Sequence, residues 1–198
     1  MTNPLNQYAH SKRWVNWKIE ARDGKHTKVP YQPNGMHADS TEPTTWSMLS
    51  ELSTNGFDGK GIILTGDLLG IDGDHVLIDG VIADNDFKRF VETANTYTEI
   101  SPSGTGLHVF LALTEPLDLP ANRHGKYECY VKGRYFTVTF DSYLDRPIRK
   151  ATPNEAIKLL GILGYPWNKK TTDQRNTAAS SMMTDDDDLL RFMFAANN

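Results

Sequence analysis

Two aspartates separated by a single residue are the first candidates for chemistry in this chain. The segment LLGIDGDHV places Asp72 and Asp74 at the end of an apolar run, where they would lie on the same side of a β-strand. Adjacent carboxylates repel each other, and a divalent cation between them removes that cost. Two-metal enzymes hold their ions about 3.5–4 Å apart with shared carboxylates, to polarise the attacking and leaving oxygens. Because many Asp-x-Asp pairs are simply turns, this pair needs support from other residues.

A calcium-binding loop that starts at Asp72 is excluded by its spacing. Such a loop needs an oxygen ligand at its fifth position, glycine at its sixth and glutamate at its twelfth. This chain has Val76, Leu77 and Ala83 at those places.

A glycine-rich turn followed by a histidine is the second candidate. In TEISPSGTGLHVF, Ser103, Gly104 and Thr105 precede an apolar strand. Flexible turns of this kind let hydroxyls and backbone N–H groups approach phosphate oxygens, and His108 would reach the same phosphates. The segment matches neither the dinucleotide fingerprint nor the P-loop, because it lacks the third glycine and the Gly-Lys-Ser/Thr ending. A tight turn before a packed core histidine is the competing interpretation.

The third candidate lies in KYECYVKGRYFTVTF, where Glu128 and Tyr130 would share one face of a strand. If this strand pairs beside the aspartate strand, Glu128 becomes the third carboxylate of a metal site. Arg134, just after an expected turn, would grip a triphosphate through two parallel hydrogen bonds. The competing interpretation is a salt bridge between Glu128 and either Lys126 or Arg134.

Hydrophobic periodicity and turn residues predict an α+β domain that would position these groups. Strands are expected at 14–19, 27–31, 61–65, 68–74, 106–113, 126–131 and 134–140. Helices are expected at 44–52, 84–97 and 153–163. The first two strands and the last two would form hairpins, and a turn at Gly66 and Asp67 would separate the third strand from the fourth.

The chain is expected to divide into three segments. Residues 1–167 would form one domain, residues 168–184 a polar linker, and residues 185–198 the start of a C-terminal helical extension. The apolar residues of that last segment have no evident packing partner, which favours a fragment of a longer protein.

Charge is unevenly distributed along the chain. The net charge of −4 argues mildly against a nucleic-acid binder. However, residues 66–99 contain eight acidic and two basic residues, and residues 121–150 contain seven basic and three acidic ones. An acidic region near a basic one suits a cation-dependent enzyme with a polyanionic substrate, although composition alone favours solvated surface for both.

Two further features restrict the class of protein. Cys129 is the single cysteine, which excludes an internal disulfide and a zinc site built from several cysteines. No apolar run is long enough to span a membrane and no secretory signal is evident, so a cytoplasmic protein without a membrane partner is expected.

Four segments together resemble the primase-polymerases of phages, plasmids and other mobile elements, which belong to the archaeo-eukaryotic primase superfamily. They are WKIEARDGKHTKVPYQPNG, GKGIILTGDLLGIDGDHV, YTEISPSGTGLHVF and KYECYVKGRYFTVTF. They occur in the order and rough spacing of that family and span residues 14–141. The combination is specific, although no single segment is.

The resemblance implies a fold and a set of site residues. The fold would be an RRM-like α/β sheet, mixed or antiparallel, with an N-terminal α/β module and a C-terminal helix. Asp72, Asp74 and Glu128 would be catalytic carboxylates that bind two Mg²⁺ or Mn²⁺ ions. The implied nucleotide-binding residues are Ser103, Gly104, Thr105, His108, Arg134 and Lys28, with His108 also assigned to catalysis.

The activity implied is DNA primase and DNA polymerase activity. Nucleotides from NTPs or dNTPs would be joined to a 3′-hydroxyl on a single-stranded DNA template, as primer synthesis, primer extension or both. Family members commonly continue into a helicase, so a helicase domain or protein in cis is an expected partner. The chain departs from the family at Gly73, where an apolar residue is usual, and at Phe140, where glycine is frequent.

Two other functions are weighed against this one. A replication-initiator nickase would need a second histidine two residues after His108, and the chain has Phe110 there. A non-catalytic single-stranded nucleic-acid-binding domain is the remaining alternative. It would bind DNA without metal dependence and would have no need of three carboxylates.

Overall fold

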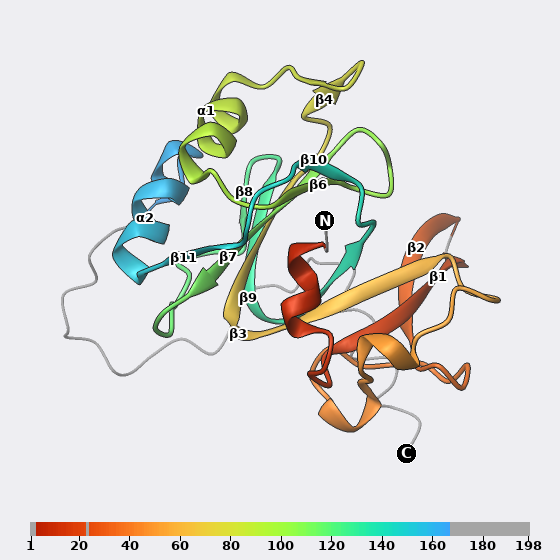
Figure 1. Ribbon diagram of the computed structural model, residues 1–198. Coiled ribbons are helices and arrows are strands. Elements are labelled where there is room, and N and C mark those ends of the chain that lie inside the picture. Colours follow the sequence, from red (N-terminus) through yellow and green to blue (C-terminus); the bar gives the residue numbers. More distant parts are fainter. Residues whose placement is uncertain (1–2, 23, 167–198) are drawn as a thin grey trace, which may run out of the picture. The chain divides into compact units, whose positions relative to one another are not determined.

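The computed structural model describes residues 3–22 and 24–166 (Figure 1). The predicted linker at 168–184 and the predicted helical extension at 185–198 lie outside these residues. Among the described residues, no helix is both long and apolar enough to cross a bilayer.

The long strand β3, Gly59–Gly73, is the centre of a mixed sheet. Strand β9, Tyr127–Val138, runs antiparallel along one edge of β3. The other edge is shared by β1, Trp14–Arg22, and β7, Leu107–Leu113, both antiparallel to β3. This arrangement confirms the α+β class and places the predicted aspartate strand between the predicted histidine and glutamate strands.

Shorter strands extend the sheet on each side. Strand β2, Lys25–Tyr31, forms the predicted hairpin with β1. Strand β6, Thr98–Ile100, pairs with β7, and β10, Ser142–Leu144, pairs with β6. Strand β8, Arg123–His124, pairs with β9, and β11, Arg149–Ala151, runs parallel to β7. A separate hairpin is formed by β4, Leu77–Ile78, and β5, Val81–Ile82.

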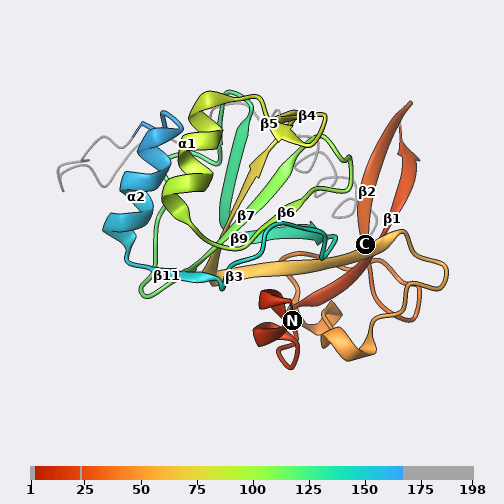
Figure 2. The ribbon, with the colours of Figure 1, turned by 45° about the horizontal axis from the view of Figure 1, so that its top comes forward.

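Two α-helices cover one face of the sheet (Figure 2). Helix α1, Asn85–Ala94, begins where the Asp84 side chain accepts a hydrogen bond from the backbone of Phe87. Helix α2, Pro153–Ile162, begins with a capping box made by Thr152 and Glu155. Apolar side chains of both helices pack on those of β3, β7 and β9 to form the larger core.

The opposite face carries a second core, and the N-terminal residues pack on it. Leu5 and Trp14 join Phe110 and Phe136 there, and all four are buried. Leu5 comes from the 3-10 helix η1, Pro4–Tyr8. Up to residue 58, the described residues contain only 3-10 helices besides the β1–β2 hairpin, so this part is less helical than the expected N-terminal α/β module.

The predicted helix at 44–52 is wrong. The segment instead forms two 3-10 turns, η2 at Pro43–Thr45 and η3 at Leu49–Glu51. Between them, Ser47 exchanges two backbone hydrogen bonds of 2.9 Å with Trp14. Because this pairing requires extended backbone, a continuous helix cannot form.

The predicted breaks at Gly66 and at Gly133 are bulges rather than turns. The two strands expected on either side of Gly66 are the single strand β3, Gly59–Gly73, and the expected second hairpin is the single strand β9, Tyr127–Val138. Gly66 has φ 102° and Gly133 has φ 69°. The pairing of β3 with β9 shifts register in this region, between Ile63 and Gly70 of β3. Glycine with positive φ serves a β-bulge as readily as a turn, and bulges keep the strand continuous.

The two departures from the family have local explanations. Phe140 has φ 60°, in the left-handed region that glycine adopts without steric cost. Gly73 is buried, and a Cβ atom there would lie 2.5 Å from the ring of Phe87 on α1. The Phe87 ring is itself fully buried and stacks on Tyr127, so it already fills the space that a larger residue would use.

We expect Gly73→Ala to lower the free energy of unfolding by about 1–3 kcal/mol, because the Phe87 ring cannot move aside. Phe87→Ala alone should cost about 3–5 kcal/mol. The double variant should cost at least 1 kcal/mol less than the sum, on the order expected for side chains in contact. Urea unfolding measures all three values.

The control for this cycle is Gly161→Ala. A Cβ atom at Gly161 in α2 meets nothing within 4 Å, so alanine there should leave stability unchanged or raise it by about 0.5 kcal/mol. Strict additivity of the two substitutions at Gly73 and Phe87 would contradict the contact.

A largely buried arginine ties β1 to β3. Arg13 is 4% exposed and donates Nε to the carbonyl oxygen of Ile63 at 2.9 Å. Its two terminal nitrogens bind the two Asp67 carboxylate oxygens at 2.8 and 2.9 Å. Burial alone would raise the pKa of Asp67, but the hydrogen bonds and charge of Arg13 outweigh it and lower the pKa.

We expect Asp67→Asn to destabilise the fold by on the order of 2 kcal/mol at neutral pH, since two charge-assisted hydrogen bonds are weakened. A depressed carboxyl pKa contributes stability above the unfolded value of about 4 and loses it as the pH falls further. The variant should therefore lose less stability on acidification than the native chain. Asp86→Asn, on the exposed first turn of α1 in a pair with Arg89, is the control and should lower stability by less than about 1 kcal/mol, with no comparable change on acidification.

Candidate active site

One row of side chains crosses the sheet near the end of β3. Asp72 lies directly opposite His108 on β7 and opposite Glu128 on β9. The row continues to Glu99 on β6, which pairs with His108, and to Arg123 on β8, which pairs with Glu128. Directly opposed residues project from the same face of a sheet. Five strands thus bring three carboxylates, one histidine and one arginine together.

Asp72 is the centre of this row and is only one-quarter exposed. Its Oδ1 lies 3.7 Å from Nε2 of His108 and is buried without a hydrogen-bond partner among the described residues. Burial raises the pKa of Asp72, and the charges of Asp74 and Glu128 raise it further, against the opposing charge of His108. A cation beside Asp72 would relieve both costs.

Asp74 stands in the turn that follows β3 and is exposed to solvent. Its backbone N–H points to the carbonyl oxygen of Lys126 at 3.4 Å, so the turn stays beside the start of β9. The negative charge of Asp74 contributes to the raised pKa of Asp72, after the larger effect of burial.

Glu128 lies in the row and is engaged by two arginines, Arg123 and Arg134, so the salt bridge weighed against a metal site is present, while its role as a metal ligand stays a prediction. One carboxylate oxygen is bound by Arg123. The other accepts the Tyr130 hydroxyl at 3.0 Å and lies 3.7 Å from Arg134. Within residues 3–22 and 24–166, no three His, Cys, Asp or Glu side chains are yet close enough to share one ion.

The turn at residues 101–106 lies against the end of β3. It is closed by hydrogen bonds of 2.9 Å from Gly104 N–H to Ser101 and from Ser101 N–H to Gly106. A Cβ atom at Gly106 would lie 2.8 Å from the carbonyl oxygen of Gly73, so only glycine allows this approach. The close contact brings the predicted phosphate-binding turn next to the aspartates.

Hydroxyl groups of the turn form a chain at its surface. Ser101 Oγ lies 3.0 Å from Ser103 Oγ, which lies 3.1 Å from Thr105 Oγ1. The chain ends at Nδ1 of His75, 3.3 Å from Thr105 Oγ1. Ser103 and Thr105 are exposed, so their hydroxyls are accessible to a ligand. Sequence reasoning assigned no role to His75, although it follows Asp74 directly, because its approach to Thr105 joins two segments that are distant along the chain.

His108 is both a packed core histidine and a neighbour of the aspartates. It is 4% exposed and its ring makes edge contacts with the rings of Phe110 and Phe136. Burial alone would lower the pKa of His108, but the carboxylates of Asp72 and Glu99 outweigh it and raise the pKa.

The other two predicted substrate contacts are Arg134 and Lys28, and the Lys28 carbonyl oxygen accepts a hydrogen bond from the hydroxyl of Tyr135, the residue after Arg134. Arg134 stands over the Tyr130 ring, with its guanidinium carbon 4.8 Å from the ring centroid. Lys28 is an exposed residue of β2, and its charge acts on the pKa of both Asp72 and His108. Sequence reasoning assigned no site role to Glu99 or Arg123, although Glu99 lies in the segment TEISPSGTGLHVF and Arg123 in the basic region 121–150, because only cross-strand pairing brings them into the row.

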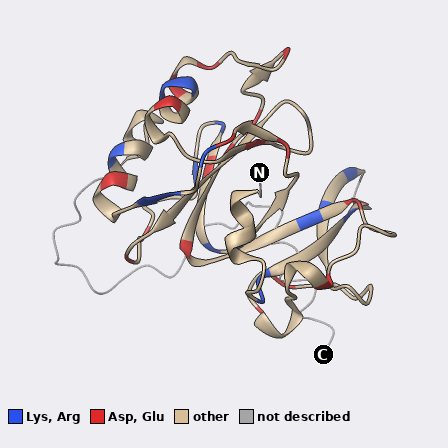
Figure 3. Cartoon of the chain, viewed as in Figure 1, with Lys and Arg blue, Asp and Glu red and all other residues tan. Residues whose placement is uncertain are grey.

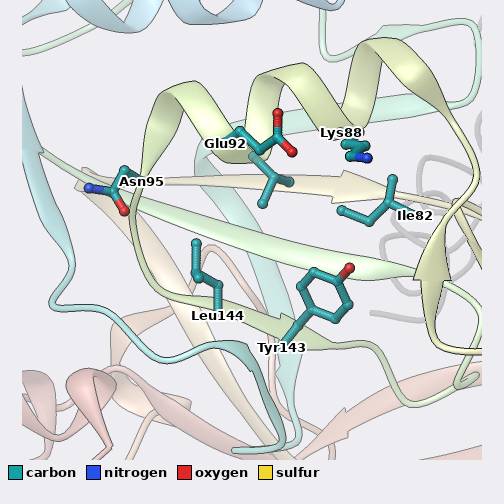
Figure 4. Close-up of a pocket in the computed structure, with 7 residues that line it drawn as sticks. Ile82, Lys88, Glu92, Asn95, Tyr143 and Leu144 are labelled. Atoms are coloured by element: carbon teal, nitrogen blue, oxygen red, sulfur yellow. The ribbon is translucent and has the colours of Figure 1, made fainter.

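A pocket elsewhere in the described residues has a different character. It lies between α1 and β10, and none of the predicted site residues lines it (Figure 4). Its lining is largely apolar and consists of Ile82, Lys88, Val91, Glu92, Asn95, Tyr143 and Leu144.

Comparison with known proteins identifies the type of domain. No protein-family model matches the chain. The DNA primase-polymerase of Nitratiruptor phage NrS-1 is 37% identical over 147 residues, which make up 68% of this chain and 20% of the relative. The chain therefore spans about one-fifth of the length of the relative it matches. This similarity confirms the resemblance carried by the four motifs, and we conclude that the chain contains a domain of the primase-polymerase type.

Proposed function

We propose that this chain is the catalytic domain of a DNA primase-polymerase, which joins nucleotides on a single-stranded DNA template. The observation that supports this most directly is the position of Asp72, opposite both His108 and Glu128 and beside the turn at 101–106. Carboxylates for cations and a hydroxyl-bearing turn for phosphates are the groups that nucleotidyl transfer needs side by side. In this proposal the sheet with α1 and α2 is the RRM-like core of the family.

Two Mg²⁺ or Mn²⁺ ions are the proposed cofactors, and the side chains present suit them. Carboxylate oxygens are the preferred ligands of both ions, and Asp72 and Asp74 supply them. The unpartnered Oδ1 of Asp72 fits a cation, and Glu128 would join after turning away from its two arginines. Bound ions would activate the attacking hydroxyl and stabilise the leaving pyrophosphate.

The nucleotide would be oriented by the chain's own polar groups. The exposed hydroxyls of Ser103 and Thr105 would donate to phosphate oxygens, with Gly104 leaving room for the phosphates to approach. His108 and Arg134 would hold the triphosphate, and Arg134 offers several N–H donors for it. Fixing the triphosphate in this way supplies the orientation that the reaction requires.

The template strand would follow basic side chains. Lys18, Lys25 and Lys28 lie along the β1–β2 hairpin (Figure 3), and residues 121–150 carry an excess of basic side chains. Contacts of this kind bind backbone phosphates and weaken as salt is added. The choice between NTP and dNTP, and a helicase partner in cis, stay predictions from the family.

The alternative is a non-catalytic domain that binds single-stranded nucleic acid. The two arginines on Glu128 favour this alternative, because they already neutralise one of the three carboxylates. The negative charges gathered at Asp72, Asp74 and Glu128 oppose it, since an acidic cluster repels a phosphate backbone unless cations are bound.

We expect Asp72→Asn to abolish synthesis without weakening the fold. Its carboxylate is destabilised by burial and by like charges, so the amide should leave thermal stability unchanged or raise it. The rate of primer extension on a defined single-stranded template should fall on the order of a thousandfold or more. Asp86→Asn, on the exposed surface of α1, is the control and should keep both properties. Normal synthesis by Asp72→Asn and by Asp74→Asn would end the proposal.

Calorimetry of Mn²⁺ binding separates the enzyme from the binding domain. An enzyme should bind Mn²⁺, more tightly with a dNTP present, and Asp74→Asn should weaken that binding. A raised Asp72 pKa means that protons compete with the cation at higher pH than at an ordinary aspartate, whose pKa is about 4. Mn²⁺ affinity should therefore fall as the pH is lowered, and this dependence should weaken in Asp72→Asn. Metal-independent DNA binding with no heat from Mn²⁺ would favour the alternative.

A further inference from the structure

Glu99 is a fully buried carboxylate to which the proposed reaction assigns no role. It lies on β6 with no exposed surface and stands next to His108 in the row that contains Asp72. One oxygen accepts the backbone N–H of Thr139 at 3.1 Å. The other accepts the Tyr97 hydroxyl at 2.9 Å and the backbone N–H of Phe140 at 3.2 Å. His108 Nδ1 lies 3.5 Å from the first oxygen.

The surroundings of Glu99 require a carboxylate. Each carboxylate oxygen of Glu99 faces two N–H or O–H groups, counting His108 as one of the four. Together these groups occupy all four lone-pair sites of the carboxylate. A glutamine has only one oxygen, and its NH₂ group would face donors instead of acceptors. Burying a carboxylate is costly, and the three anchoring bonds offset part of that cost while fixing the orientation of the group.

His108 is placed so that its two ring nitrogens have different neighbours. Nε2 faces Asp72 at 3.7 Å, and Nδ1 faces Glu99 at 3.5 Å. Nδ1 has no hydrogen bond of ordinary geometry among the described residues, so Glu99 is the acceptor it approaches. Phe110 and Phe136 meet the ring edge-on and restrict its plane. Hydrogen bonds of catalytic groups are often long before substrate binds and shorten in the complex.

The partner of one imidazole nitrogen decides which nitrogen carries the proton. We propose that Glu99 is a positioning residue, which keeps a proton on Nδ1 of His108 and thereby directs Nε2 into the site. This inference rests on the proposed function, because it assigns to the nucleotide the Nε2 side of the ring, which donates to a phosphate oxygen when the imidazolium carries a proton on both nitrogens. Glu99 itself touches no substrate and acts through His108 alone.

The kinetic test is a double-mutant cycle in primer extension. Glu99→Gln should lower kcat/KM for the nucleotide about 10- to 100-fold, by analogy with the loss of the carboxylate partner of a metal-ligating histidine. In a His108→Ala background the same change should cost less than about threefold, because the residue through which it acts is gone. An equal loss in both backgrounds would show a merely structural role and overturn the inference.

The matched control is Tyr97→Phe. It removes one of the three anchoring hydrogen bonds of Glu99 and leaves the approach to His108 intact. We expect its kcat/KM to stay within about twofold of the native value, even where its stability falls as much as that of Glu99→Gln. Equal kinetic losses in Tyr97→Phe and Glu99→Gln would contradict the proposal.

A spectroscopic measurement keeps the inference testable if Glu99→Gln does not fold. Long-range ¹H–¹⁵N spectra of the native protein, with His108 assigned by its loss in His108→Ala, report which ring nitrogens carry protons. A proton on Nδ1 supports the inference, and a bare Nδ1 with the proton on Nε2 overturns it. This result does not depend on synthesis, so a native chain with Nδ1 protonated but no polymerase activity would remove the proposed function and leave the role of Glu99 in orienting His108.

Discussion

The site depends on the register of β3 between β7 and β9. Side chains alternate across a strand, so a slip of one residue in either pairing would carry Asp72 to the helical face, away from its partner. The apolar neighbours of Asp72 hold the register, because Ile71 faces the core under α1 and α2, where it is fully buried. The position of the acidic row is therefore a consequence of how the opposite face of the sheet packs.

The row is electrostatically unfavourable where two carboxylates are neighbours. Asp72 on β3 and Glu128 on the adjacent strand β9 face each other directly. Burial of Asp72 and the charge of Glu128 both disfavour its ionised form. His108 beside Asp72 and Arg123 beside Glu128 supply positive charge, which offsets part of the repulsion between the two carboxylates. Residual strain of this kind is typical of sites that bind a cation or a charged substrate, because the ligand completes the compensation.

Two glycines allow the site to be assembled tightly. Gly106 lets the turn at 101–106 meet the carbonyl of Gly73, and Gly73 in turn leaves room for the ring of Phe87 on the helical side. The end of β3 is thus packed from both sides by groups that a Cβ atom would displace. The consequence is that the turn at 101–106 is held at a fixed distance from the aspartates, which is the preorganisation that the proposed nucleotidyl transfer would need.

The sequence by itself determined the order of most strands, both long helices, and the identity of the aspartate, histidine and glutamate segments, because these depend on local periodicity and on motifs. It did not distinguish a bulge from a turn at Gly66 and Gly133, since glycine with positive φ serves both. Only the tertiary structure decided that Glu99 and Arg123 end the row, and that Glu128 lies beside both an aspartate and two arginines. Cross-strand register joins residues that are distant along the chain, and no pattern within a single segment encodes which residues will face one another.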